Sequence, residues 1–372
     1  MDPRFPVTQH CIYLNHAGIA PLPAPVAGVI KDFCDEAQET GGMKYGAWMQ
    51  REKETRRLTA ELINAPAADD IAFLKNTSEG ISLLATGYDW QPGENTVLLA
   101  GEFPSTRLAW QPLHNRGIEV REIEVSATDP ESDLLTAMDE QTRILVVSAV
   151  HWETGLKLDL ERLGRACSEN SVIFCVDAMQ WLGAMRLDVQ KCQIDFLACS
   201  GHKWLMAPEG IAITFVSDDL REKLALQQHG WRMFDRPFNF SKRERDPATS
   251  ARRYEAGSPN TIGIFGLHAA LTMAQQESAA AIETAVLDNT AFLTNQLIDV
   301  DGVELLSPTD PARQSGIVLF KLASRNAMQI YDVFKSSHIV CAQRAGGIRL
   351  SPHFYTPREQ LEITVSEIFK LI

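Results

Sequence analysis

The sequence lacks the patterns that mark several common protein classes. It contains no uninterrupted apolar run close to the roughly 18 residues that a membrane span requires. Its first residues hold no basic stretch followed by an apolar core, so we expect no secretory signal peptide. The phosphate-binding patterns G-x-G-x-x-G and G-x-x-x-x-G-K-S/T are absent, as is the G-x-S-x-G turn of serine hydrolases. These absences argue against a nucleotide-binding protein and against a Ser-His-Asp hydrolase.

Basic residues and cysteines are both scarce. The chain has 35 lysines and arginines against 48 aspartates and glutamates, which gives a net charge of −13. This balance argues against a general binder of nucleic acid or anionic membranes. The seven cysteines are an odd number without any C-x-x-C pair, which favours a reducing compartment over a disulfide framework or a zinc site. We therefore expect a cytoplasmic protein with no nucleic-acid partner and no membrane partner.

The composition and the order of apolar patterns predict a two-domain α/β protein. With 45% apolar and 22% charged residues, the 372-residue chain is an ordinary globular protein that exceeds the usual size of one core. Strand-like and helical patterns alternate up to about residue 216, which predicts a mostly parallel sheet with helices on both faces. An irregular stretch rich in arginine and aromatics follows at 228–253. We predict an N-terminal segment, 1–25, packing with the small domain; a large α/β domain, 26–260; and a small α+β domain, 261–372.

The stretch from 172 to 204 holds the most informative polar residues. Two strand-like runs, VIFCV and IDFLACS, are followed by Asp177 and by Lys203. Open α/β folds keep their ligands at the carboxyl ends of parallel strands. A lysine directly after a buried strand is placed to lose solvent and to have a lowered pKa, as Schiff-base formation requires. Asp177 lies 26 positions before Lys203 on the preceding strand, so both side chains can reach one ligand.

Three further positions carry polar groups at expected element ends. Thr77 and Ser78 lie between a strand and a helix, where they can bind phosphate or simply cap the helix. His151 follows an apolar strand that ends at the same sheet edge as Asp177. Arg349 lies inside an apolar strand, so we expect it to pair with the carboxylate of a ligand or with an internal acid.

One cofactor would use all of these groups together. Pyridoxal 5′-phosphate needs a lysine for its Schiff base, a carboxylate against its pyridine nitrogen, a donor-rich phosphate site and a flat group over its ring. Lys203, Asp177, Thr77 with Ser78, and His151 offer these groups in turn. The sequence therefore predicts a pyridoxal-phosphate site at this edge of the sheet.

The runs NTSEG, VHWETG, VDAMQ, CSGHKW and YEAGSPN together resemble the class V aminotransferase family of fold-type I pyridoxal-phosphate enzymes. This group includes cysteine desulfurases and selenocysteine lyases, and the likeness extends over nearly the whole chain. The resemblance implies an obligate homodimer with its sites at the subunit interface and a small α-amino acid as substrate. It implies that Lys203 forms the Schiff base, that Asp177 pairs with the pyridine nitrogen and that Gln180 contacts the phenolic oxygen of the cofactor. It further implies that His151 stacks on the cofactor ring and that Arg349 binds the substrate carboxylate. The residues that the resemblance assigns to the phosphate are Thr77, Ser78, Ser200, His202 and the second subunit's Ser258.

The resemblance leaves the reaction open. A desulfurase needs a cysteine thiolate that attacks the substrate sulfur, and Cys341 is the one cysteine near the expected place. It precedes Arg349 by only eight positions, whereas similar desulfurases carry a longer loop there, and Glu153-Thr154 replaces the more usual Ser-Asn. Our first hypothesis is a C–S lyase similar to cysteine desulfurases. The alternatives are an aminotransferase, an amino-acid epimerase and a cofactor-free binding or regulatory homologue. Candidate residues for the substrate side-chain pocket are His16, Trp231 and Arg344.

Overall fold

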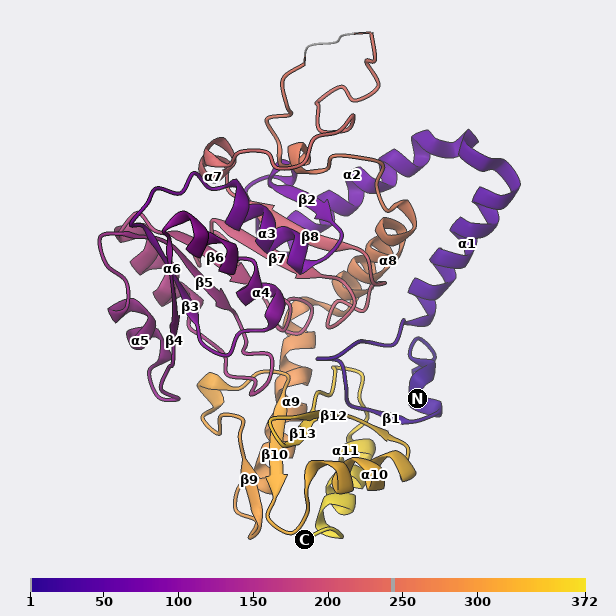
Figure 1. The fold of residues 1–372 in the computed structure, drawn as a ribbon. Coiled ribbons are helices and arrows are strands. Elements are labelled where there is room, and N and C mark those ends of the chain that lie inside the picture. The colour runs from indigo at the N-terminus through magenta and orange to yellow at the C-terminus, as the bar shows by residue number, and fades with distance from the viewer. Residues whose placement is uncertain (1, 242–244) are drawn as a thin grey trace.

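The computed structural model describes residues 2–241 and 245–372, and it contains a seven-stranded sheet in the order β2-β8-β7-β6-β5-β3-β4. Neighbouring strands are parallel except at β8, which runs antiparallel to both β7 and β2. The prediction of a mostly parallel sheet is therefore confirmed (Figure 1). The strands are β2 Ile71–Leu74, β3 Asn95–Leu99, β4 Glu119–Ile123, β5 Thr142–Ser148, β6 Ile173–Asp177, β7 Phe196–Ser200 and β8 Ala212–Val216.

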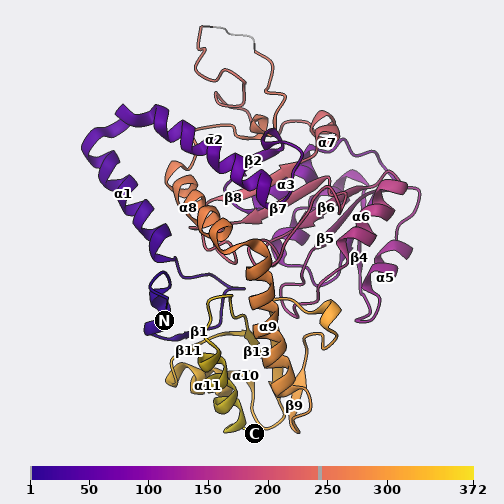
Figure 2. The ribbon, with the colours of Figure 1, turned by 180° about the vertical axis from the view of Figure 1, so that it is seen from behind.

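The central strands are buried on both faces because helices cover the sheet from both sides. Along β5, Leu145 and Val147 belong to one apolar cluster, while Ile144 and Val146 belong to another. Successive side chains of a strand point to opposite faces, so a continuous apolar run supplies two cores. Helices α2, α5, α6 and α8 contribute to the first cluster, and α3 and α7 contribute to the second (Figures 1 and 2). The helices of this part are α1 Ala24–Thr40, α2 Tyr45–Leu62, α3 Thr77–Gly87, α4 Pro104–Leu108, α5 Pro130–Thr136, α6 Leu160–Glu169, α7 Asp218–Lys223 and α8 Thr261–Glu277.

The C-terminal part has a sheet and an apolar cluster of its own. Its four strands are antiparallel in the order β12-β13-β10-β9. Ile12 and Leu14 from the N-terminal segment join its apolar cluster, and β1 pairs in parallel with β11. The domain boundaries at residues 25 and 260 remain a prediction. The elements are β1 Ile12–Tyr13, α9 Ala279–Leu297, β9 Val303–Leu305, β10 Val318–Leu322, α10 Ala327–Ser336, β11 Ile339–Val340, β12 Ala342–Arg344, β13 Gly347–Leu350 and α11 Arg358–Phe369.

Two further features concern the outside of the molecule. Within 2–241 and 245–372, no helix combines the length and the apolar character that crossing a membrane demands. Residues 242–244 of the irregular stretch predicted at 228–253 lie outside the described residues; the part from 228 to 241 projects away from the large sheet (Figure 1) and exposes Phe238 and Phe240. Short 3-10 helices occupy Pro6–Gln9, Gly41–Lys44, Ala68–Asp70, Gln111–Arg116, Ala251–Tyr254 and Pro311–Arg313.

Candidate active site

A cavity of about 290 Å³ lies at the carboxyl ends of three neighbouring strands. Ser148, Asp177 and Ser200 are the last residues of β5, β6 and β7, and all three line it. Pairing in register brings these ends together, since Ser148 lies beside Asp177 across the sheet. The remaining lining residues come from the N-terminal segment, from α3 and α4, and from the C-terminal part: Ala17, Gly18, Asn76, Thr77, Ser78, Phe103, Ser105, Val150, Trp152, Met179, Gln180, His202, Lys203, Arg344 and Arg349.

Lys203 lies three residues beyond the end of β7, and its Nζ is 5.6 Å from the centroid of the Phe103 ring. Loss of solvent lowers its pKa to about 8, the attraction of Asp177 acts in the opposite direction, and the repulsion of Arg349 adds to the lowering. An amine with this pKa is partly neutral near pH 7. Lys203 therefore has the nucleophilic character that Schiff-base formation needs.

Asp177 is buried, and both of its carboxylate oxygens accept hydrogen bonds. Met179 N donates to Oδ1 at 2.9 Å, and Thr106 Oγ1 donates to Oδ2 at 2.7 Å. Burial raises the pKa of Asp177, while these bonds and the charge of Lys203 act against the increase. A protonated pyridine nitrogen beside Asp177 would provide a positive charge for this carboxylate. The environment of Asp177 therefore fits its predicted role.

The amino end of α3 forms a donor-rich corner of the cavity. Thr77 N donates to Ser200 Oγ at 2.8 Å, and Ser200 N donates to Thr77 Oγ1 at 3.0 Å. Ser78 Oγ donates to Ser105 Oγ at 2.7 Å. Hydroxyl donors together with the positive end of the helix dipole favour an anion such as phosphate. Asn76, rather than Thr77 or Ser78, caps the helix by accepting a hydrogen bond from Glu79 N at 2.9 Å, so neither hydroxyl group is used as the helix cap.

Gln180 is held in the cavity wall by two hydrogen bonds. Its Nε2 donates to Ala17 O at 3.0 Å, and its Oε1 accepts from Trp204 Nε1 at 2.8 Å. The amide nitrogen carries a second hydrogen that remains for a ligand oxygen. His202 also lines the cavity. The structure thus brings seven of the predicted cofactor residues together around one space: Thr77, Ser78, Asp177, Gln180, Ser200, His202 and Lys203.

Two predicted cofactor residues are not part of this cavity lining. The ring of His151 lies at Gly101 O, 3.1 Å from its Nε2, while its Nδ1 is 3.0 Å from Thr154 Oγ1. Ser258 lines a separate cavity of about 420 Å³. The predicted stacking of His151 therefore remains a prediction, as does the role of Ser258, which the resemblance assigns to the opposite subunit.

Arg349 is almost completely buried on β13, and its contacts in the described part of the chain are not ionic. One of its terminal nitrogens donates to Trp152 O at 2.5 Å, and its buried Nε has no hydrogen-bond partner. No acid in the described part of the chain forms an ion pair with it, so the predicted internal salt bridge is not seen there. Burial lowers its pKa to about 9, and repulsion from Arg344 adds to the effect. A buried guanidinium in this state favours an anionic ligand.

Cys341 lies outside the cavity. It is 5% exposed and belongs to the apolar cluster of the small sheet, together with Ile339 and Ile348. Burial raises the pKa of its thiol to about 12, so the thiolate form is rare near neutral pH. This position does not suit a nucleophile that meets a substrate at Lys203.

Several lining residues were not singled out from the sequence. Phe103 and Ser105 line the cavity from the turn and short helix after β3, and Thr106 of the same helix contacts Asp177. No periodic pattern marks this segment. A polar cluster after a strand, as at Thr77, was the available signal for Ser105. Among the three candidates for the side-chain pocket, only Arg344 is in the cavity lining that the structure describes. His16 is buried, with its ring nitrogens at Ser351 O and at the Tyr355 hydroxyl. Trp231 packs on Phe238 and Phe240.

The residues present fit pyridoxal 5′-phosphate. The Nε of Arg349, which has no hydrogen-bond partner, and the hydroxyl groups at the amino end of α3 favour anions, and Lys203 and Asp177 supply an amine and a carboxylate in the same cavity. The volume of about 290 Å³ is close to the lower limit for small-molecule sites.

Comparisons with known proteins agree with this description. The profile of the family described as Aminotransferase class-V matches residues 12–362. A probable cysteine desulfurase of Methanothermobacter thermautotrophicus is 28% identical over 394 residues, which cover 98% of this chain and 96% of the relative. The uncharacterized aminotransferase YcbU of Bacillus subtilis is 25% identical, with 98% and 95% covered. The solved structure of the cystine C–S lyase C-DES with its product cysteine persulfide matches with a TM-score of 0.92 at 24% identity, covering 99% of each chain.

Proposed function

The chain belongs to the class V aminotransferase family, and we propose that this enzyme cleaves the carbon–sulfur bond of a small α-amino acid. Its cofactor is pyridoxal 5′-phosphate, so the predicted family, fold type, enzyme class and cofactor are confirmed. The name of the M. thermautotrophicus relative supports a reaction at sulfur. The position of Cys341 separates this proposal from desulfuration through a protein cysteine, because that thiol is buried away from Lys203.

The cavity residues divide the work of such a cleavage among them. Arg349 binds the substrate carboxylate and orients Cα toward Lys203, whose neutral amine takes the Cα proton. The bound cofactor supplies a ring that accepts the negative charge left at Cα. The negative charge of the Asp177 carboxylate would stabilise the protonated, positively charged pyridine nitrogen of that ring. The Cβ–S bond then breaks with its electron pair on sulfur, Lys203 holds the proton for transfer to a leaving group, and water converts the three-carbon remainder to pyruvate and ammonium.

Product analysis tests this proposal. The purified holoenzyme is given cysteine or cystine, and sulfide or persulfide, pyruvate, ammonium and alanine are measured for the wild type, Cys341→Ser and Lys203→Ala. We expect sulfur release with equal pyruvate, no loss in Cys341→Ser and no product from Lys203→Ala. If the wild type formed alanine in place of pyruvate and Cys341→Ser were inactive, the reaction would be desulfuration through Cys341.

Transamination is the second candidate, because it needs no thiol and therefore fits the buried position of Cys341 equally well. The name of the B. subtilis relative also supports it. In this reaction an amino donor would leave as its keto acid, and the cofactor would remain in its amine form. A change of the cofactor spectrum with one keto acid per subunit and no sulfur release would favour transamination over C–S cleavage.

We also propose a cytoplasmic homodimer with the domain division predicted above. Ser258 lines a separate cavity from Lys203 in one chain, so a second subunit is needed if Ser258 is to reach a cofactor. The exposed Phe238 and Phe240 on the projecting stretch support a surface that another subunit covers. Sedimentation equilibrium of the holoenzyme tests the subunit number, and a monomer would rule out the proposed arrangement.

A further inference from the structure

Thr106 is a buried hydroxyl residue that has no part in the reaction described above, yet it contacts Asp177 directly. It lies on α4, and its side chain is completely buried. Its Oγ1 donates to Asp177 Oδ2 at 2.7 Å, while Oδ1 accepts a hydrogen bond from Met179 N at 2.9 Å. Of these two donors, Thr106 is the one that belongs to a side chain, so a substitution can remove it.

The segment that carries Thr106 is held from two sides. Before the helix, Glu102 accepts hydrogen bonds from Ser148 N and Ser148 Oγ at the end of β5. Within the helix, the neighbouring Ser105 accepts a hydrogen bond from Ser78 Oγ, at 2.7 Å, at the amino end of α3. A threonine side chain is branched at Cβ, so few rotamers are open to it. These contacts together hold the Thr106 hydroxyl against the carboxylate.

Asp177 needs such a donor because burial opposes its negative charge. Burial raises the pKa of the Asp177 carboxyl group, and the hydrogen bond from Thr106 is the strongest effect in the opposite direction. The hydrogen bond from Met179 N and the charge of Lys203 follow it in strength. Hydrogen bonds to an ionised group are stronger than those between neutral groups. Removal of the Thr106 hydroxyl would therefore shift Asp177 toward its neutral form.

We propose that Thr106 is a positioning residue that keeps the Asp177 carboxylate ionised and directed at the pyridine nitrogen of the cofactor. Thr106 is not among the described lining residues of the cavity, so it acts through Asp177. The ionised carboxylate stabilises a positive charge on the ring nitrogen, whereas the neutral acid does not. This role deepens the proposed function at its cofactor site, and it rests on the cofactor rather than on the bond that is cleaved.

An altered cofactor tests this role without turnover. The cofactor-free full-length protein is titrated with pyridoxal 5′-phosphate and with an analogue whose ring nitrogen is replaced by a C–H group. Tryptophan fluorescence measures both affinities. We expect Thr106→Val, which keeps the shape of the side chain, to weaken pyridoxal 5′-phosphate about tenfold or more and to leave the analogue within about twofold. Equal losses for both compounds, or no loss for either, would overturn the proposal.

Two further variants separate the hydrogen bond from packing. Thr106→Ser keeps the hydroxyl group and should retain the wild-type affinity for pyridoxal 5′-phosphate. The matched control is Thr96→Val, because Thr96 is also completely buried but donates to a backbone carbonyl, Ile144 O, at 3.0 Å. This control should preserve the wild-type ratio of the two affinities. A Thr106→Ser variant as weak as Thr106→Val would count against the hydrogen bond.

The pH dependence of cofactor binding gives a second measurement. Without the hydroxyl of Thr106, the pKa of Asp177 is higher, so Asp177 takes up its proton at a higher pH as the solution is acidified. We expect the affinity of Thr106→Val for pyridoxal 5′-phosphate to fall at a higher pH than that of the wild type, with Thr106→Ser like the wild type. Coincident acidic limbs would overturn the proposal. Neither measurement involves a substrate, so failure of the carbon–sulfur cleavage would leave both results unchanged.

Discussion

Lys203 has a lowered pKa because its amine leaves water at the edge of a buried strand. Desolvation, with repulsion from Arg349, exceeds the attraction of Asp177 and brings the pKa to about 8. The neutral amine is the nucleophile, so its fraction rises as the pH rises through this value. The cofactor-free enzyme should therefore take up pyridoxal 5′-phosphate faster as pH increases from about 7 to 9, with a midpoint near 8. The visible absorbance of the lysine-bound cofactor measures the rate, and Lys203→Ala should show no such band at any pH. A pH-independent rate would contradict the assignment.

Glu102 is a second buried acid beside the site. It accepts hydrogen bonds from Ser148 N and Ser148 Oγ, and Ser148 is the register neighbour of Asp177. Burial raises the pKa of Glu102 to about 8, and the negative charge of Asp177 adds to this increase. The folded state then retains a proton that the unfolded state loses at lower pH. Stability should fall as pH rises from about 4.5 to about 8.

Glu102→Gln removes this titration while keeping a group that can accept hydrogen bonds. We expect the free energy of unfolding of the wild type to decrease by up to about 1.4 kcal/mol per pH unit more than that of the variant across the window. Urea unfolding of the cofactor-free proteins at a series of pH values measures the difference. Parallel pH profiles would show that Glu102 titrates alike in the folded and unfolded states.

At the scale of elements, the strand ends were the predictable part of the site. Asp177, Ser200 and Lys203 follow apolar runs, and parallel pairing of β6 with β7 necessarily places those ends at one edge. The alternation of strands and helices predicted the sheet, but it contains no signal for the antiparallel direction of β8. Sequence periodicity also says nothing about short helices, which explains why Phe103, Ser105 and Thr106 were missed.

Side-chain orientation was a further limit on prediction from the sequence. The direction of the His151 ring depends on the carbonyl of Gly101, which lies 50 positions away in the chain. The burial of Cys341 depends on how the small sheet packs on α10 and α11. Such tertiary contacts are set by packing partners far away in the sequence, so the local pattern around either residue could not reveal them.

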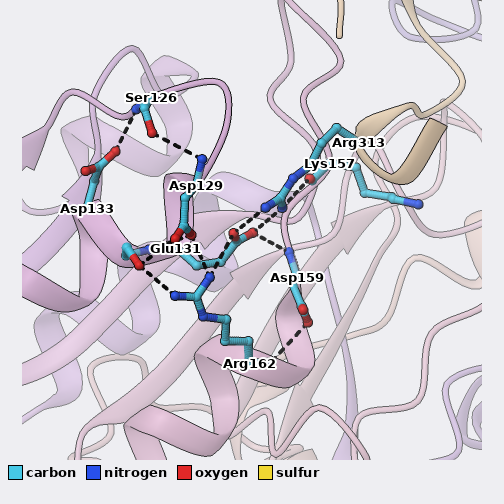
Figure 3. A network of polar contacts seen from close by, with 9 residues as sticks. Ser126, Asp129, Glu131, Asp133, Lys157, Asp159, Arg162 and Arg313 are labelled. Carbon is cyan, nitrogen blue, oxygen red and sulfur yellow. Dashed lines mark hydrogen bonds and ion pairs between the residues drawn. The ribbon is translucent and has the colours of Figure 1, made fainter. Parts of the chain in front are cut away.

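A buried ion pair joins the segment before β10 to helix α5, which packs on the large sheet (Figure 3). Arg313 donates to both oxygens of Glu131, at 2.6 and 2.7 Å, and the Glu131 side chain is completely buried. Asp159 N donates to the same carboxylate at 2.6 Å. The segment that carries Arg313 leads into β10, which pairs with the strand of Arg349. The pair therefore helps to fix the small sheet relative to the cavity.

Arg313→Ala should destabilise the protein, because it leaves the Glu131 carboxylate buried with the backbone donor of Asp159 and the more distant guanidinium of Arg162. We expect a loss of about 3 kcal/mol in the free energy of unfolding. The matched control is Lys191→Ala, which breaks the exposed pair with Glu161 and should cost less than about 1 kcal/mol. Urea unfolding measures both values, and equal losses would contradict a special contribution of the buried pair.

At the scale of the whole molecule, three separate parts of the chain meet at the cavity. Gln180 binds Ala17 O from the N-terminal segment and accepts from Trp204, whose carbonyl lies 3.0 Å from His353 Nε2 in the C-terminal part. These contacts connect the wall of the cavity to the N-terminal segment and to the C-terminal part of the same chain. The phosphate side at α3 remains open to the proposed contribution of the second subunit's Ser258.

Mixed dimers test whether Ser258 acts across the interface. Lys203→Ala should be inactive, and Ser258→Ala should bind the cofactor about 10- to 100-fold more weakly, since a hydrogen bond to a charged group contributes about 1.5–3 kcal/mol.

The mixed dimer contains one Lys203→Ala chain and one Ser258→Ala chain. Its single site with intact Lys203 receives intact Ser258 from the partner chain only if Ser258 acts in trans. Differently tagged chains allow the mixed dimer to be purified, and its cofactor affinity is then titrated by visible absorbance. We expect one site per mixed dimer with wild-type affinity and turnover. If Ser258 served its own subunit, every intact lysine would remain beside the Ser258→Ala change, and the mixed dimer would show only the weakened site.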